Sequence, residues 1–286
     1  RTTVPNLPFC HNISHIAKKQ GHAMPDKIQV SAPILHNQRL QKDYYQLDLS
    51  AASIAKLAKP GQFVHVQLPE LQHRILRRPF SIFNVDLDSG CLSIIYKIVG
   101  EGTEHLSKLA PGDVLDLLGP LGNGYTLFPK NRKGIIVAGG YGSAATYLLA
   151  KNAPAPPVVL IGGRSKDDIL LQDDFKRLGC ELKIATNDGS AGHHGMVTEL
   201  LTQAIAKTSN PAVAACGPNA MLKAVSEIVE KNGIDAELSL DHAMCCGVGA
   251  CFACVVKRKA DTPNGWAYSR TCIDGPVFKA SEIWWD

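Results

Sequence analysis

The sequence lacks any apolar run of the ~18 residues that a membrane-spanning helix requires. Its net charge of +4 is small for 286 residues, and the positive excess lies in residues 1–60, which hold 8 Lys or Arg against 3 Asp or Glu. No basic face for nucleic acid is therefore expected. Internal repeats and low-complexity tracts are also lacking. With 45% apolar residues, the chain is expected to form two or three globular domains, with no nucleic-acid or membrane partner.

Side-chain patterns for protein-based acid, base or nucleophilic catalysis are lacking as well. The 10 histidines show no metal-ligand spacing, and neither a Ser/His/Asp arrangement nor a carboxylate pair is evident. We therefore expect no catalytic residue of the protein itself, and chemistry carried by bound cofactors, for which a protein supplies position and electrostatics.

The first residues have their own composition. Residues 1–25 contain no Asp or Glu, and Met24 directly precedes Pro25. We expect residues 1–26 to be a disordered N-terminal extension rather than a transit-type leader. Truncation at Met24 should then leave activity and bound cofactor intact.

Hydrophobic periodicity divides the rest into three units. Residues 27–129 hold short apolar or alternating runs between turns, which predicts an antiparallel barrel. Residues 130–235 alternate short aliphatic runs with helical windows, which predicts a Rossmann-like parallel sheet. Residues 236–286 are rich in Cys and Gly and form a third, small unit. The expected strands include 28–35, 44–49, 63–68, 80–85, 91–99, 134–138, 157–161, 182–185 and 212–215, and the expected helices 167–178, 197–206 and 219–231, with a further helical window through Ala150.

The strongest motif lies among the cysteines. Five of the 9 cysteines fall in the last 42 residues, and four of these follow C-x4-C-x2-C…C, the plant-type [2Fe–2S] spacing. Glycines and alanines between them allow the backbone to curl over inorganic sulfides. The predicted ligands are Cys246, Cys251, Cys254 and Cys272. A structural zinc site is the alternative, but such sites usually pair two C-x2-C knuckles and only one is present. Cys245 breaks the spacing and is treated as a bystander.

Two motifs in the barrel region point to a bound dinucleotide. The first is Arg78-Pro79-Phe80-Ser81, in which the arginine suits a pyrophosphate and the aromatic suits a flat ring. The second runs from Tyr96-Lys97 to Gly102-Thr103, where a strand leads into a helix start that suits a phosphate. Each has a plain alternative: a solvated strand end for the first and an ordinary capped turn for the second.

A glycine motif opens the second unit. Gly140 and Gly142, with Ala145, fit G-x-G-x-x-A after a short aliphatic strand, the setting of a dinucleotide-binding turn. Arg164 stands near the end of the next strand where an acidic residue would mark NAD, so NAD and NADP stay open on these residues alone. Cys216 ends a later strand at the same edge, either near a nicotinamide or as a buried small hydrophobe.

Together these motifs resemble the electron transfer subunits of NAD-dependent (class 1B) dihydroorotate dehydrogenases, within the ferredoxin reductase-like superfamily. The resemblance runs from about residue 27 to Phe278, and the cysteine loop with its closing Asp-Gly-Pro-Val-Phe is its most specific part. It rests on residues 76–82, 100–103, 119–124, 188–190, 215–218, 246–254 and 270–278.

The resemblance implies a chain of redox centres for pyrimidine biosynthesis. FAD would lie on the barrel with Arg78 at its pyrophosphate, Phe80 and Ser81 beside the isoalloxazine, and Gly102-Thr103 at the phosphates. NAD(H) would dock over Gly140 and Gly142 with Cys216 near the nicotinamide. The [2Fe–2S] cluster would face an FMN-containing catalytic subunit in a heterotetramer of two plus two, and the location would be cytoplasmic because cluster thiolates need a reducing compartment.

Departures from the family pattern are few. Ala144-Ala145 stands where Ala-Pro is usual, Asn187 where Asp is frequent, and Ala243-Met244 where Arg-Met is frequent. Two alternatives stay open on these residues: a related sulfhydrogenase-type or ferredoxin-linked NAD(P)H reductase subunit, and a zinc-stabilised nucleotide-binding module without a redox role.

Overall fold

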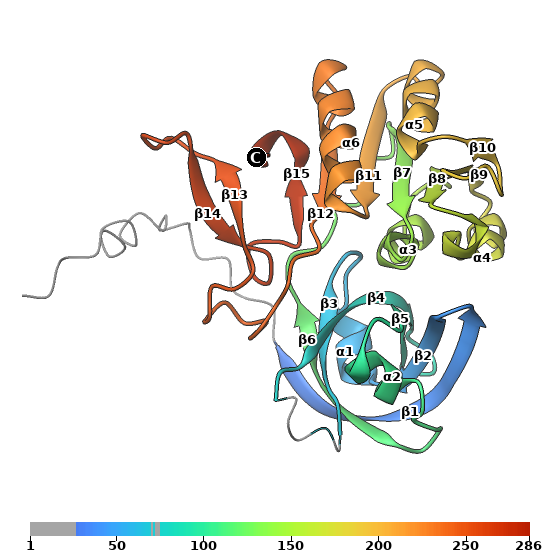
Figure 1. The fold of residues 1–286 in the computed structure, drawn as a ribbon, viewed down its shortest axis with the longest axis vertical. Coiled ribbons are helices and arrows are strands. Elements are labelled where there is room, and N and C mark those ends of the chain that lie inside the picture. The colour runs from blue at the N-terminus through green and yellow to red at the C-terminus, as the bar shows by residue number, and fades with distance from the viewer. Residues whose placement is uncertain (1–26, 70, 72–74) are drawn as a thin grey trace, which may run out of the picture.

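The computed structural model describes residues 27–69, 71 and 75–286 (Figure 1). The expected N-terminal extension lies outside the described residues. A barrel, a parallel sheet flanked by helices, and a cysteine-rich C-terminal part follow one another along the chain. This architecture confirms the fold class that the sequence predicts. None of the helices in the described part of the chain has the length and apolar character needed to span a membrane.

The first unit is a closed antiparallel barrel with the strand order β1-β2-β5-β4-β3-β6. Alternation along its strands sends one set of side chains inward, where Val64, Val66, Leu115 and Leu117 are fully buried. Closure leaves the barrel without an unpaired sheet edge. The elements are β1 (Ile28–Gln41), β2 (Tyr44–Ser50), α1 (Ala52–Leu57), β3 (Phe63–Gln67), β4 (Arg78–Asp86), β5 (Cys91–Lys97), α2 (Glu101–Leu106) and β6 (Val114–Leu121).

The second unit is a seven-stranded sheet with the order β10-β9-β8-β7-β11-β12-β15, in which β12 (Ala236–Ser239) and β15 (Val277–Lys279) come from the C-terminal part of the chain. In β7, Ile135 and Val137 pack with α5 and α6 on one face, whereas Ile136 packs with the layer that faces the barrel. Helices α3 and α4 lie on that barrel side (Figure 1). The elements are β7 (Lys133–Gly139), α3 (Gly142–Lys151), β8 (Val158–Gly163), η3 (Lys166–Asp168), α4 (Gln172–Arg177), β9 (Glu181–Thr186), β10 (His193–His194), α5 (Val197–Ala206), β11 (Pro211–Cys216) and α6 (Asn219–Lys231).

The barrel and the sheet share an interface built on α3. The ring of Tyr147 in α3 lies 4.7 Å from the ring of Phe83 in β4, measured between centroids. At the other end of the interface, the side chain of Gln41 donates hydrogen bonds of 3.0 Å to the carbonyls of Asp167 and Ile169. The two units are therefore joined by both apolar and polar contacts.

The helix expected over residues 167–178 is shorter than predicted. A 3-10 turn, η3, ends at Asp168, and α4 begins only at Gln172. The buried Ile169 and Leu170 lie between them in non-helical backbone. Packing of these two side chains and the hydrogen bonds of Gln41 to this segment outweigh the local helical pattern.

The C-terminal part adds two strands to the sheet, and the residues between these strands lie outside it. Strand β12 (Ala236–Ser239) runs parallel to β11, and β15 (Val277–Lys279) pairs antiparallel with β12. Between them come the cysteine loop and a hairpin of β13 (Val255–Lys259) and β14 (Trp266–Arg270). The short turn η4 (Ala280–Glu282) follows β15. The sequence places a domain boundary at 235/236, which stays a prediction, but strands on both sides of it belong to one sheet.

Candidate metal and cofactor sites

The segment of residues 246–254, called the cysteine loop, curls around the thiol of Cys246. Its Sγ accepts hydrogen bonds from the backbone N–H groups of Val248 (3.5 Å), Ala250 (3.3 Å) and Cys251 (3.4 Å). The curl requires glycine, because Gly249 has a φ of +85° and a Cβ there would lie 2.6 Å from the Cδ1 of Ile273. The loop therefore presents its amide groups to one sulfur atom.

The four predicted ligands form two pairs. Cys251 is close enough to Cys246, and Cys254 close enough to Cys272, for each to shift the pKa of its neighbour's thiol. Among the residues that the structure describes, no group of three or more His, Cys, Asp or Glu side chains is placed to hold one metal ion. Two pairs match the chemistry of a [2Fe–2S] cluster, in which each iron takes two protein ligands. The donor set thus fits that group.

The two pairs differ in environment. Cys254 and Cys272 are buried against Phe63 and Leu121 of the barrel, whereas Cys251 is exposed. Burial opposes ionisation of Cys246, but the backbone N–H groups around its sulfur prevail and lower its pKa to about 6. Burial and the neighbouring Cys254 raise the pKa of Cys272 to about 12. One predicted ligand is therefore ready as a thiolate, and another would have to lose its proton on binding a metal.

Cys245 lies beside the first pair without belonging to the motif. Desolvation together with the neighbouring Cys251 thiol raises the pKa of the Cys245 thiol. The structure thus places a fifth sulfur next to a predicted ligand.

The predicted flavin-binding residues 78–81, called the flavin motif below, begin β4, which pairs directly with β3. Gly102 lies against the guanidinium of Arg78, because a Cβ on this glycine would come within 3.4 Å of Nε. Arg78 also donates a hydrogen bond to the carbonyl of Leu76. The structure therefore brings together the two barrel motifs that the sequence assigns to one dinucleotide.

The aromatic residues of these motifs form a stack on the barrel. The ring of Phe80 meets the buried Tyr96 edge-on at 5.9 Å between centroids, and Tyr45 stacks on Tyr96 at 5.5 Å. Burial raises the pKa of Tyr96, whose hydroxyl donates to the Oδ1 of Asn37 at 3.0 Å. Pro79 and Ser81, like Phe80, are half-buried on the same strand.

Two other predicted residues are engaged within the protein. The hydroxyl of Thr103 accepts from the N–H of Val99 (2.9 Å) and donates to the carbonyl of Gly100 (3.0 Å). The ammonium group of Lys97 lies 3.3 Å from the hydroxyl of Tyr44 and 3.5 Å from the Oδ1 of Asp168. Thr103 thus closes its own turn, and Lys97 belongs to a polar cluster between barrel and sheet.

The glycine motif and Cys216 meet at the carboxyl edge of the sheet. Cys216 ends β11 beside Ala138 of β7, and a Cβ on Gly142 would lie 2.1 Å from the Cys216 carbonyl oxygen. Gly140 has a φ of +56° and open space in front of it, because a Cβ there would meet only the Tyr44 hydroxyl, at 3.8 Å. Burial raises the pKa of Cys216 to about 12. The thiol is therefore neutral at pH 7.

Sequence reasoning missed two residues of these sites. Asp168 links Tyr44, Lys97 and Arg164, whose Nε lies 3.3 Å from its Oδ2. His65, fully buried on β3, lies against Gly247 of the cysteine loop. Alternation along β3 offered a signal for His65, since it points opposite to Val64 and Val66, but no sequence pattern marked Asp168.

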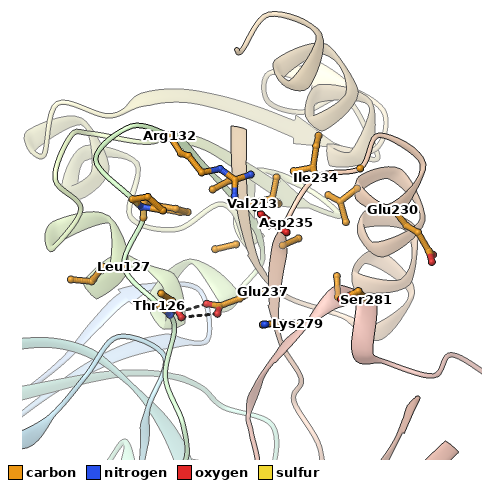
Figure 2. Close-up of a pocket in the computed structure, with 18 residues that line it drawn as sticks. Thr126, Leu127, Arg132, Val213, Glu230, Ile234, Asp235, Glu237, Lys279 and Ser281 are labelled. Atoms are coloured by element: carbon orange, nitrogen blue, oxygen red, sulfur yellow. Dashed lines mark hydrogen bonds and ion pairs between the residues drawn. The ribbon is translucent and has the colours of Figure 1, made fainter. Parts of the chain in front are cut away.

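A cavity of about 630 Å³ lies away from these sites, beside β12 and α6 (Figure 2). Figure 2 shows the carboxylate of Glu237 beside Thr126 on one side and Asp235 below Arg132 on the other. None of the residues that the sequence predicts for cofactor or metal binding lines it.

Two family models match the chain. Residues 31–125 match the oxidoreductase FAD-binding domain, and residues 241–284 match the iron–sulfur cluster binding domain of dihydroorotate dehydrogenase B. Among solved structures, the NADH-dependent reduced ferredoxin-NADP oxidoreductase, described for flavin-based electron bifurcation, is similar with a TM-score of 0.78, 30% identity and 90% coverage of both chains. The ferredoxin reductase of carbazole 1,9a-dioxygenase has a similar fold, with a TM-score of 0.61 and 20% identity over 73% of this chain and 67% of its own.

Curated relatives cover nearly the whole chain. The dihydroorotate dehydrogenase B (NAD(+)) electron transfer subunit of Enterococcus faecalis is 41% identical over 87% of this chain and 96% of its own length. The subunit of the same name from Desulforamulus reducens is 38% identical over 85% and 93%. These matches confirm the resemblance that the sequence motifs indicate. The chain belongs to the family of dihydroorotate dehydrogenase B electron transfer subunits.

Proposed function

We propose that this chain is the electron transfer subunit of an NAD-dependent dihydroorotate dehydrogenase in pyrimidine biosynthesis. It accepts electrons from an FMN-containing catalytic subunit and delivers them through a [2Fe–2S] cluster and FAD to NAD+. The observation that carries the proposal is the packing of Cys254 and Cys272 against Phe63 of β3, the strand that pairs with the flavin motif on β4. The metal and flavin sites are thus one strand apart.

Each proposed cofactor has its own set of residues. Bound FAD passes electrons singly or in pairs, which suits it to join a one-electron cluster to hydride transfer. Arg78 neutralises the pyrophosphate, and the half-buried face of β4 and the Tyr96 region support the ring system. The proposed cluster ligands are Cys246, Cys251, Cys254 and Cys272, and the proposed cofactor-binding residues are Arg78, Pro79, Phe80, Ser81, Tyr96, Lys97, Gly102 and Thr103 for FAD and Gly140, Gly142 and Cys216 for NAD(H).

The exposed side of the cysteine loop supports a partner at this end of the chain. Cys251 is exposed, and so is 45% of Phe252, an apolar residue next to it. The guanidinium of Arg270 lies 5.0 Å from the centroid of the Phe252 ring and holds it at the surface. We assign this surface to the catalytic subunit, in a cytoplasmic heterotetramer of two plus two chains.

The decisive test combines composition and activity. The full chain, purified anaerobically, should be yellow-brown and contain FAD, iron and acid-labile sulfide, and NADH should bleach its flavin absorption. Mixed with the FMN-containing catalytic chain from the same organism, it should support dihydroorotate-dependent reduction of NAD+. A colourless protein that contains zinc would overturn the proposal in favour of a zinc-stabilised nucleotide-binding module.

A second candidate is a ferredoxin-linked NAD(P)H reductase subunit. The specific observation in its favour is the 30% identity over 90% of both chains with the reduced ferredoxin-NADP oxidoreductase structure. Partner choice separates the two functions. Co-purification with a ferredoxin-linked or hydrogenase chain, and failure to accept electrons from the dihydroorotate-oxidising chain, would favour this second candidate.

A further inference from the structure

His65 is a buried polar side chain without a visible role in the fold. It is 0% exposed, and both of its ring nitrogens lack a hydrogen-bond partner among the residues that the structure describes. A buried polar group left unpaired destabilises the folded state, because it gives up its hydrogen bonds to water without replacement. A histidine at this position therefore calls for a partner other than the residues that the structure describes.

The orientation of the ring indicates where that partner lies. A Cβ on Gly247 would be 2.5 Å from the Cε1, 2.8 Å from the Nδ1 and 2.8 Å from the Nε2 of His65. Gly247, the residue that follows Cys246, thus packs over the face of the imidazole at Cε1, and the two ring nitrogens lie directly beneath the cysteine loop. Gly247 has a φ of +67° and no side chain, and both features let the ring approach the loop.

The neighbour two residues earlier on the strand strengthens this placement. Phe63 and His65 share one face of β3, opposite to the inward-facing Val64, and their ring centroids are 5.6 Å apart. Phe63 packs against Cys254 and Cys272. The same strand face therefore contacts the second cysteine pair through Phe63 and the loop of the first pair through His65.

The chemistry of the ring suits a sulfur acceptor. Burial and the positive charge of Arg77 lower the pKa of His65 to about 4, so the ring is neutral at pH 7 and carries one N–H donor. Thiolates and inorganic sulfides are anionic acceptors, and hydrogen bonds to these sulfurs are among the factors that set the potential of an iron–sulfur cluster.

We propose that the ring N–H of His65 donates a hydrogen bond to a sulfur atom of the iron–sulfur group in the cysteine loop, and thereby raises its reduction potential. This inference rests on the proposed function, since it requires the cluster. His65 is then a positioning and tuning residue on the barrel. In the pairing of β3 with β4 it lies opposite Pro79, a residue of the flavin motif.

The first test measures the reduction potential of the cluster in the full chain loaded with FAD and iron–sulfur group. His65→Phe keeps a flat ring but removes the donor, and should lower the equilibrium constant for one-electron reduction about tenfold, which corresponds to about 59 mV. His65→Gln retains an N–H donor and should stay within about threefold of the wild type. An unchanged potential in His65→Phe would overturn the proposal.

A matched control is available in α2. His105 also has a buried ring nitrogen without a partner among the described residues, but its helix belongs to the barrel region of the Gly102 motif rather than to the cysteine loop. His105→Phe should therefore leave the cluster potential unchanged. An equal shift in both variants would assign the effect to general packing and overturn the inference.

The second test uses the wild-type chain and does not depend on the folding of any variant. With ¹⁵N-labelled histidine, pulsed electron paramagnetic resonance of the reduced cluster should detect coupling to an imidazole nitrogen. A spectrum without this coupling would overturn the inference even if His65→Phe fails to retain the cluster. Absence of iron and sulfide from the purified chain would instead refute the proposed function, so the two failures are distinguishable.

Discussion

The hydroxyl of Tyr44 in the barrel donates a hydrogen bond of 3.0 Å to the Oδ1 of Asp168 in the segment that follows β8 of the sheet. Lys97 and Arg164 approach the same carboxylate. Although burial alone would raise the pKa of Asp168, the Tyr44 hydrogen bond and these two cations hold it below its ordinary value. The ionised Asp168 carboxylate thus links the barrel to the sheet next to the glycine motif.

Replacement of Tyr44 by Phe should weaken this contact. The variant loses one buried hydrogen bond and leaves part of the Asp168 carboxylate without a donor, which should lower the free energy of unfolding by about 1–3 kcal/mol. Urea denaturation of the FAD-loaded chain would measure the change. Tyr45→Phe, on the adjacent residue whose ring stacks on Tyr96, is the control and should change stability by less than about 0.5 kcal/mol.

Cys251→Ser should separate the two halves of the electron path. Loss of one predicted ligand should remove the cluster and stop electron transfer to the catalytic subunit, while reduction of FAD by NADH persists. Iron and sulfide analysis and stopped-flow absorbance would follow the two properties. Cys245→Ser should keep the cluster, because this thiol lies outside the motif, and normal electron transfer in Cys251→Ser would contradict the ligand assignment.

The adjacent arginines of the flavin motif should differ in their effect on FAD. Arg78→Ala removes the guanidinium beside Gly102 and should weaken FAD binding about 10- to 100-fold, the cost of losing charge-assisted hydrogen bonds. Arg77 is instead paired with Asp116 at 2.8 Å, so Arg77→Ala is the matched control and should leave FAD affinity nearly unchanged. Titration of the flavin-free chain with FAD, followed by fluorescence, would measure both constants. Equal losses would argue against a pyrophosphate role for Arg78.

Two alanine substitutions in the glycine motif test close backbone approach. In Gly142→Ala the new methyl would lie 2.1 Å from the Cys216 carbonyl oxygen, so β11 and α3 must separate. In Gly140→Ala the methyl meets only the Tyr44 hydroxyl at 3.8 Å, and the cost is the strain of a φ of +56°, about 1 kcal/mol. Gly142→Ala should therefore lower the midpoint temperature of thermal unfolding more than Gly140→Ala does. The reverse order would contradict the packing described at this edge.

Much of this fold follows from local sequence patterns. Helices α5 and α6 have the bounds that periodicity predicts, 197–206 and 219–231, because each apolar stripe faces one buried layer. The cysteine spacing is also a local feature of the sequence, since three of the four predicted ligand thiols lie within nine consecutive residues. Such features depend on neighbours along the chain and are readable from it.

Other features depend on residues distant in sequence. The 167–178 helix is interrupted because Gln41, far away in β1, binds the carbonyls of Asp167 and Ile169. His65 meets Gly247 only after the C-terminal part folds back on β3. Similarly, β15 completes the sheet from the far end of the chain, so the sheet extends beyond the predicted boundary at 235/236. Tertiary contacts of this kind carry no local sequence signature.

The two borders of the seven-stranded sheet also bear on how copies of the chain meet. One border is β10, with 2 residues, and the other is β15, with 3. Strands this short present few unpaired backbone groups, so they are poor templates for joining sheets of separate molecules. Extension of the sheet is thus disfavoured as a mode of aggregation or self-assembly, and side-chain surfaces are left to determine which subunits associate.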